Sequence, residues 1–208
     1  MTDVFTTHIP PMAVEYCHQL LQYYKFRFRV VKPRRTRLGD FRVLPLNQTQ
    51  ITVNANLNPY SFLITYVHEV AHAAVHQQSI IQRRRRLKPH GKAWQTAFQQ
   101  LMQPLLIEAI FPAIILRPLK HYMANPGATT YSHPELMLAL RQFDAGANEA
   151  VPTNRVLLSD VLEGDVFQLA QKTYVRGTLR RTRVVCKEVK SGKSYAILAH
   201  AWVNINVD

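Results

Sequence analysis

The chain has 208 residues, 47% of them hydrophobic, and 26 Lys and Arg against 13 Asp and Glu give it a net charge of +13. This composition provides enough apolar side chains for a buried core and argues against a disordered chain. The length suits one domain with a small appendage or two small domains. The positive charge favours a polyanionic partner, most simply nucleic acid, and a solvated basic face is the alternative.

Nothing in the sequence indicates export or a membrane. Residues 1–12 lack the basic start and the apolar stretch of a signal peptide. The longest apolar run, residues 105–116, is interrupted by a glutamate and a proline and is shorter than the roughly 20 residues that cross a bilayer. Cys17 and Cys186 lie far apart in the sequence, which favours two buried thiols in a reducing compartment. We therefore expect a soluble, cytoplasmic protein without membrane partners.

The first third of the chain predicts a helix followed by a small sheet. Prolines precede a helical stripe of apolar residues, which predicts a helix over residues 10–24. In residues 25–31 aromatic and basic side chains alternate, which predicts a half-buried strand with an outer face of arginines. Residues 41–46 and 50–57 have the composition of two further strands. Together they predict a small antiparallel sheet.

A long, largely apolar helix is expected next. Asn58 is a suitable N-cap and Pro59 suits the first helical position, and the pattern continues to about Gln78. Residues 79–89 are expected to form a loop. Further helices are predicted over residues 90–103, in short pieces broken by prolines over 104–123, and over 132–143 with a serine cap.

The last quarter of the chain has a different pattern. Residues 144–154 are small, polar and punctuated by proline, as in a linker. Short strand-like runs separated by turns follow, and KSGK at 190–193 is the clearest hairpin. We expect an α+β chain with one domain over residues 1–145 and a small β-rich module over 155–208.

The segment TYVHEVAHAAVH, residues 65–76, is the strongest functional signal. In a helix, His68 and His72 lie one turn apart on one face, so both imidazoles can reach one ion. Glu69 lies about 100° around the helix, from where it can reach a metal-bound water without being a ligand. This is the H-E-x-x-H arrangement of zinc peptidases. The alternative is a pair of hydrogen-bonded core histidines beside a salt-bridged glutamate.

A catalytic zinc site needs a third protein ligand. His76 would lie about 12 Å along the axis from His68, which is too far, so a contact beside the site or a position at the helix end is expected for it. Glu108 is distant and in a poorly defined segment. The longer motif H-E-x-x-H-x-x-G-x-x-H is excluded, because Val75 and Gln78 stand where it requires Gly and His.

His90 is therefore the predicted third ligand. It follows a loop long enough to turn back, at the start of a predicted helix, and Gly91 is expected to give the backbone freedom that brings its ring in. A surface histidine at a helix start is the alternative.

The residues YVHEVAHA, followed by a basic segment and HGKAW, resemble the SprT-like zinc metallopeptidase family. The resemblance covers roughly residues 10–105 and implies a minimal zincin-like domain. In that family H-E-x-x-H supplies two zinc ligands and the glutamate base, and a later histidine supplies the third ligand. The resemblance thus implies one catalytic Zn²⁺ on His68, His72 and His90, with Glu69 as the catalytic base.

The C-terminal module departs from this family. Many SprT-like proteins carry a zinc ribbon with paired C-x-x-C motifs, and this chain has none. Residues 155–208 are either a ribbon that has lost its metal ligands, with Cys186 as the remaining one, or an unrelated β-module. A second structural zinc is not predicted.

The resemblance also implies a substrate class. Eukaryotic members of the family cut proteins that are covalently trapped on DNA, so we expect a peptidase acting on DNA-associated or DNA-crosslinked proteins. Non-specific binding to nucleic-acid phosphates is expected from the arginines near the site. These are Arg83, Arg84, Arg85 and Arg86, extended by Arg34 and Arg35. The alternative is a transcription-related, nucleic-acid-associated factor with a structural zinc site and little peptidase activity.

Overall fold

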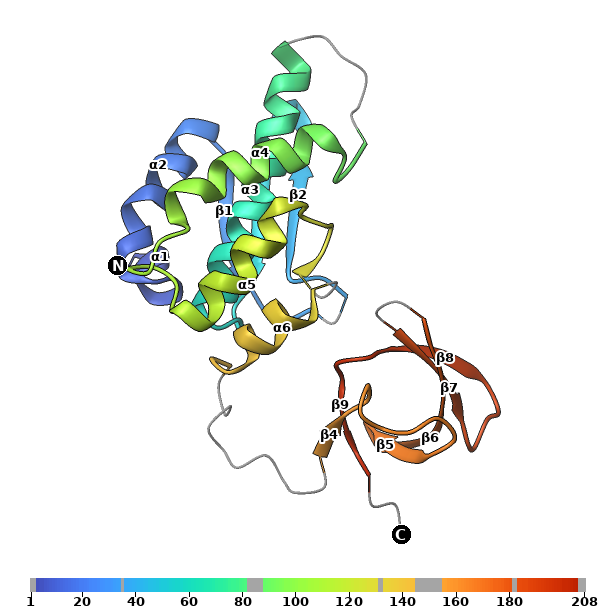
Figure 1. Cartoon of the computed structure of the whole chain (residues 1–208). Helices are drawn as coiled ribbons and strands as arrows, with labels where there is room; N and C mark the ends of the chain where they lie inside the picture. The colour runs from blue at the N-terminus through green and yellow to red at the C-terminus, as the bar shows by residue number, and fades with distance from the viewer. Residues whose placement is uncertain are drawn as a thin grey trace. The chain divides into compact units, whose positions relative to one another are not determined.

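A computed structural model describes residues 3–34, 36–81, 88–130, 133–144, 155–180 and 183–205. The chain forms two compact units, Met1–Ala145 and Gly146–Asp208 (Figure 1). The first combines helices with a sheet and the second consists of strands, which makes the chain a mixed α and β protein as expected. Within the described residues, no helix combines the length and the apolar character that spanning a membrane requires.

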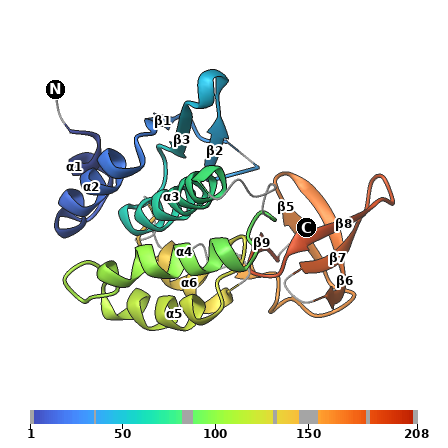
Figure 2. The ribbon, with the colours of Figure 1, turned by 90° about the horizontal axis from the view of Figure 1, so that it is seen from above.

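The first unit is built around one long helix. Figure 2 shows this helix, α3, between the sheet on one side and the later helices on the other. The α-helices are α1 (Val4–His8), α2 (Val14–Tyr24), α3 (Pro59–Ile81), α4 (Lys92–Met102), α5 (Ala113–Ala124) and α6 (Pro134–Arg141). The strands are β1 (Arg27–Val31), β2 (Gly39–Val43) and β3 (Thr49–Asn54).

The sheet of this unit is mixed, so the expected antiparallel sheet was wrong. The strand order is β1-β3-β2, and β3 pairs antiparallel with β2 but parallel with β1. The last two strands form a hairpin through a 3₁₀ turn at Pro45–Asn47. The connection from β1 to β2 leaves a gap of one strand between them, and β3 fills that gap. The alternation predicted for β1 is confirmed, since Arg27 and Arg29 are exposed and Phe28 is partly buried against the core.

Helix α3 begins where the sequence predicts. The Asn58 side chain accepts a hydrogen bond from the Ser61 backbone N–H at 2.9 Å, which caps the first turn, and its amide donates to the Leu140 carbonyl at 2.9 Å. The helix continues to Ile81, three residues beyond the expected end. Ten of its residues are buried, because it packs against the sheet on one side and against α4 on the other.

Two details of the other helices differ from expectation. Pro118 lies inside α5 and does not break it, since buried residues on both sides of the proline hold the helix in the core. Helix α6 is capped by the His133 ring, which accepts from the Leu136 N–H at 3.3 Å; the expected serine cap, Ser132, lies outside the described residues.

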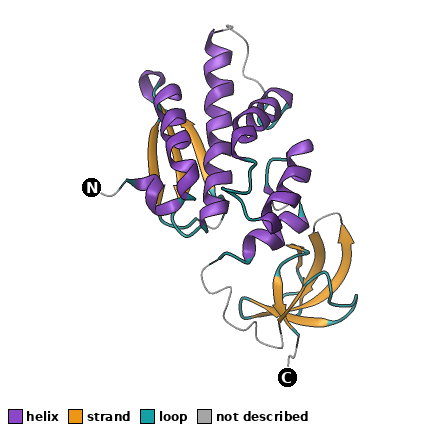
Figure 3. Cartoon of the chain, turned by 60° about the vertical axis from the view of Figure 1, so that its left-hand side comes forward, coloured by secondary structure: helices purple, strands orange, loops and turns teal. Residues whose placement is uncertain are grey.

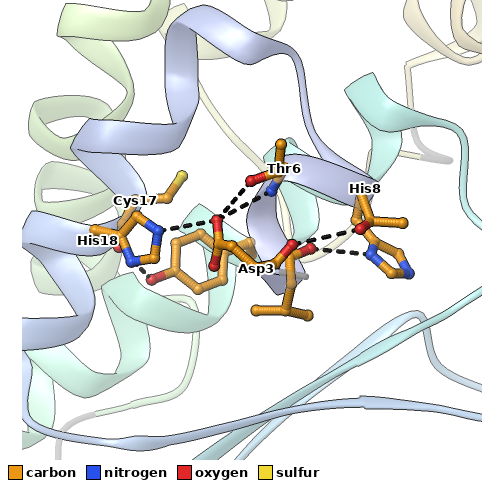
Figure 4. Close-up of polar contacts among 8 residues, drawn as sticks. Asp3, Thr6, His8, Cys17 and His18 are labelled. Carbon is orange, nitrogen blue, oxygen red and sulfur yellow. Dashed lines mark hydrogen bonds and ion pairs between the residues drawn. The ribbon is translucent and has the colours of Figure 1, made fainter. Parts of the chain in front are cut away.

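The one-turn helix α1 was not expected, because five residues carry no periodic signal. Asp3 caps it by accepting hydrogen bonds from the backbone N–H of Thr6 at 3.2 Å and from its hydroxyl at 2.8 Å (Figure 4). The same carboxylate lies 3.0 Å from Nε2 of His18 on α2. Phe5 is fully buried and its ring packs against those of Phe28 and Tyr66. This short helix therefore closes one end of the core.

The second unit has a hydrophobic core of its own. Its strands, seen in Figure 3, are β4 (Arg155–Leu157), β5 (Val166–Leu169), β6 (Lys172–Arg180), β7 (Arg183–Glu188), β8 (Ser194–Leu198) and β9 (Trp202–Asn204). They form one sheet in the order β4-β9-β5-β6-β7-β8. The hairpin predicted at KSGK is confirmed between β7 and β8, whereas β4 was not expected. Cys186 is fully buried in this core and its thiol is free, as is that of Cys17 in the first unit. The expected linker lies, apart from Asp144, outside the described residues.

Candidate metal centre

Three histidine rings converge where α3 meets the segment just before α4. His68 and His72 belong to α3, and His90 lies two residues before the first residue of α4. Nε2 of His90 lies 3.1 Å from Nε2 of His68 and 3.0 Å from Nε2 of His72. All three ligand atoms lie within 4.8 Å of one another. In a tetrahedral zinc site with Zn–N bonds of about 2.0–2.1 Å, two ligand nitrogens lie about 3.3 Å apart. Two of the three nitrogen–nitrogen distances are thus close to the spacing that one ion requires, and the trio could bind a metal ion.

The backbone at the start of α4 brings the third ring into place. His90 itself has a left-handed conformation, with φ of 54°, whereas Gly91 has an ordinary φ of −77°. The expectation that Gly91 supplies unusual backbone freedom was therefore wrong. Glycine matters there for space instead, since a Cβ on residue 91 would lie 3.0 Å from the Lys88 carbonyl oxygen, to which the Gly91 N–H donates. This tight turn places the His90 ring over α3.

An aromatic wall from α4 backs the three rings. The Trp94 ring centroid lies 4.6 Å from that of His68, 5.6 Å from that of His72 and 4.7 Å from that of His90. Its indole N–H donates to the His68 carbonyl at 3.3 Å, and the ring stacks on Phe98. Because Trp94 is 1% exposed, it fixes the relative positions of α3 and α4 at the site and limits the room in which the imidazoles can rotate.

The surroundings keep the three imidazoles neutral. Burial lowers the pKa of His68 well below its ordinary value, and the neighbouring His72 and His90 rings lower it further. Burial, with the His90 ring, lowers the pKa of His72 to about 4, and burial also lowers the pKa of His90. A neutral imidazole is the form that binds metals. The site therefore presents three lone pairs at pH 7 without first having to lose protons.

Glu69 lies against the edge strand β2. Glu69 is 7% exposed, and its carboxyl accepts a backbone hydrogen bond from Phe41. Strand β2 can approach this closely because residue 39 is glycine: a Cβ there would lie 2.6 Å from Oε1 of Glu69. The Phe41 ring stacks on that of His72, with centroids 6.4 Å apart, so the strand that holds the carboxyl also contacts the histidine trio.

Burial controls the protonation of this carboxyl. It raises the pKa of Glu69 from 4.5 to about 8, and the charge of Asp40 adds to the rise. The guanidinium groups of Arg34 and Arg37 oppose it. Asp40 is itself paired with Arg37, at 2.6 Å, and with Arg42. Glu69 thus titrates close to neutrality, in the range that suits a group that accepts and returns a proton.

The other sequence candidates fall outside the trio. His76 lies one turn beyond His72, with its ring 5.7 Å from that of Phe41, and Glu108 is exposed on the surface. Arg34 donates to Asn54 at 2.9 Å and to Thr52 at 3.0 Å on β3, so two of its donors are engaged within the unit and its nucleic-acid role stays a prediction. The remaining predicted phosphate contacts lie outside the described residues; they are Arg35, Arg83, Arg84, Arg85 and Arg86.

Sequence reasoning missed the contributions of Gly39, Phe41 and Asp40 to the environment of Glu69. The glycine next to an aspartate at the start of a strand in RLGDFRV was the available signal. It could not be used without knowing that β2 pairs at the edge of the sheet and crosses α3 at residue 69.

The donor set fits zinc. Within the part of the chain that the structure describes, this trio alone brings three His, Cys, Asp or Glu ligand atoms together. It consists of imidazoles only, which suit zinc and other borderline divalent ions better than magnesium or calcium. Comparisons of the chain with protein-family models, curated proteins and solved structures gave no match. The assignment of a metal site therefore depends on the three histidines and their geometry.

Proposed function

We propose that His68, His72 and His90 hold one zinc ion and that the chain is a zinc-dependent peptidase. The observation that carries this proposal is the convergence of three neutral imidazole nitrogens, together with the buried side chain of Glu69, which directly follows the first of the three histidines in the sequence and on the same helix. Three protein ligands leave one of the four tetrahedral positions open, as in catalytic rather than structural zinc sites.

The chain's own residues have distinct parts in this mechanism. A zinc ion held there would supply Lewis-acid activation of a water molecule and of the substrate carbonyl. Glu69 accepts the proton of the attacking water and returns it to the amine nitrogen of the leaving group. Burial raises the pKa of Glu69 to about 8 in the metal-free chain. The positive charge of a zinc ion held nearby would lower this pKa, so that the carboxylate form that accepts a proton would be available near neutral pH. Trp94 and Phe41 hold the ligand rings in position.

The resemblance to SprT-like metallopeptidases supports the same function and a zincin-like identity of the first unit. In support, the H-E-x-x-H residues lie on the central helix α3, a three-stranded sheet covers one side of it, and the third ligand precedes the helix on the other side. The net charge of +13 supports substrates associated with nucleic acid, including proteins crosslinked to DNA. A purely structural metal site would not need a carboxyl held at the position of Glu69.

The test is proteolysis by the purified chain of casein and histones, with zinc and single-stranded DNA supplied. Wild type is expected to degrade them and to be inhibited by a chelator. Glu69→Gln is expected to lower the rate by a factor of about 100 or more while zinc remains bound. Glu108→Gln, which changes an exposed glutamate, is the matched control and should keep full activity. Full activity in Glu69→Gln would contradict the assignment of the base.

A further inference from the structure

A cavity of about 470 Å³ lies in the first unit at the C-terminal end of α3. Its walls come from the end of α2, the start of β1, the turn between β2 and β3, and the second half of α3. None of the three histidines of the candidate metal centre lines it. Its size is within the range of about 300–1,000 Å³ that is usual for small-molecule sites.

The charge of this cavity is positive. Lys25 and Arg27 line it, and no Asp or Glu among the described residues does. Both side chains are exposed, and among the described residues neither has a carboxylate partner within ion-pair distance. Lys25 is held at the C-cap of α2 in a left-handed conformation, with φ of 51°, and Arg27 is the first residue of β1. Two neighbouring cations without carboxylate partners favour an anionic ligand, and arginine suits the paired oxygens of a phosphate.

Neutral polar groups complete the lining. The amide side chains of Asn47, Gln48 and Gln77 line the cavity, and none of them forms a hydrogen bond to another residue that the structure describes. His76 also lines it, and its Nε2 atom is buried without a hydrogen-bond partner among the described residues. These groups can donate and accept, so they fit a ligand that carries both kinds of group beside its charge.

One wall is apolar and includes an aromatic ring. Tyr24 and Ile80 line the cavity together with Ala73. The Tyr24 ring is held by an edge contact with Tyr23, at a centroid distance of 4.8 Å. Nucleobases stack on aromatic rings of this kind.

We propose that this cavity binds a nucleotide, with its phosphate group at Lys25 and Arg27 and its base against Tyr24 and Ile80. The two cations supply the charge, the amides supply hydrogen bonds to the sugar and base, and the aromatic wall supplies the stacking surface. Because the cavity and the histidine trio are lined by different residues, this proposal does not depend on the proposed peptidase activity.

Binding to the full-length chain is tested by calorimetry with AMP, adenosine and inorganic phosphate as probes. AMP is expected to bind saturably. Adenosine, which lacks the phosphate, is expected to bind at least about tenfold more weakly than AMP. Arg27→Ala and Lys25→Asn should each weaken AMP binding about tenfold. Asparagine is chosen at position 25 because it tolerates a positive φ. Arg29→Ala is the matched control: it removes the same charge from the same exposed face of β1 but does not line the cavity, and it should leave the affinity within about twofold.

The proposal is overturned if AMP does not bind saturably, if adenosine binds as tightly as AMP, or if Arg27→Ala and Arg29→Ala have equal effects. A competition experiment with a short single-stranded oligonucleotide identifies the source of the nucleotide. If the oligonucleotide displaces AMP, and if Arg27→Ala but not Arg29→Ala weakens this displacement, the cavity binds a nucleotide within a strand. If the oligonucleotide does not displace AMP, the cavity binds a free nucleotide. Glu69→Gln should bind AMP as wild type does, which separates this outcome from that of the protease test.

Discussion

Glu69 on α3 and Gly39 on β2 are in such close contact that a methyl group on residue 39 would lie 2.6 Å from the Glu69 carboxyl oxygen and 2.7 Å from the Thr65 side chain. The edge strand of the sheet is therefore fitted to the helix at the position of the proposed base. Its Phe41 N–H and its Asp40 side chain both influence the carboxyl. Residues of β2 thus contribute to the pKa of Glu69 alongside its burial.

Gly39→Ala is expected to displace the Glu69 carboxyl or the strand, because real Cβ atoms do not approach other atoms so closely. We expect a loss of about 1–3 kcal/mol in the free energy of unfolding, with reduced proteolysis. Chemical denaturation of Gly39→Ala, Glu69→Ala and the double variant measures the coupling. The double variant should be more stable than the sum of the single changes predicts, since alanine at 69 makes room. Strict additivity would show that the two residues do not interact.

The pH dependence of stability should change when Glu69 is replaced by glutamine. Between pH 4.5 and about 8 the folded metal-free chain holds a proton on Glu69 that the unfolded chain has released, so this carboxyl lowers stability as the pH rises. Glutamine resembles the protonated carboxyl and does not titrate, so the substitution removes this loss of stability with rising pH. The stability of Glu69→Gln relative to wild type should therefore increase from pH 5 to pH 8, by up to about 4 kcal/mol.

Thermal or chemical unfolding in the presence of a chelator measures this difference at several pH values. Glu108→Gln, at an exposed position, is the control and should show no such trend. A difference between Glu69→Gln and wild type that stays constant with pH would contradict the account of the buried carboxyl.

Trp94→Phe should weaken the metal centre without removing a ligand. The change deletes the hydrogen bond to the His68 carbonyl and part of the surface packed against all three histidine rings. We expect the free energy of unfolding to fall by about 1–3 kcal/mol and zinc affinity to fall about tenfold. Zinc titration against a competing chelator measures the affinity. Trp202→Phe, at the partly exposed tryptophan of the second unit, is the control. Equal zinc affinity in both variants would show that Trp94 does not organise the site.

The histidine trio could be predicted from the sequence because its parts are local. Two ligands follow from helical spacing, and the helix itself follows from Asn58, Pro59 and the apolar run. His90 required only a turn back onto the same helix, which Trp94 and its neighbours on α4 stabilise by packing. Sheet order could not be predicted in this way. Whether β3 pairs parallel or antiparallel with β1 depends on the path of residues 32–38, which carry no regular pattern.

The surroundings of Glu69 and the backbone of His90 were also beyond the sequence. The environment of the carboxyl depends on which residue of β2 crosses α3, a contact between segments about 30 positions apart. At HGKAW the glycine suggested the unusual conformation, yet the histidine adopts it. Gly91 instead leaves room for the Lys88 carbonyl oxygen, which a Cβ at position 91 would approach to 3.0 Å. Local rules identify such a turn but do not assign the positive φ to one of its residues.

The zinc content of purified protein, measured by mass spectrometry, tests the central claim most directly. One zinc per chain is expected in wild type, in Glu69→Gln and in the control His121→Ala, which changes an exposed histidine. His90→Ala is expected to carry well below one zinc per chain. Full zinc occupancy in His90→Ala, or no zinc in wild type supplied with the metal, would contradict the three-histidine site.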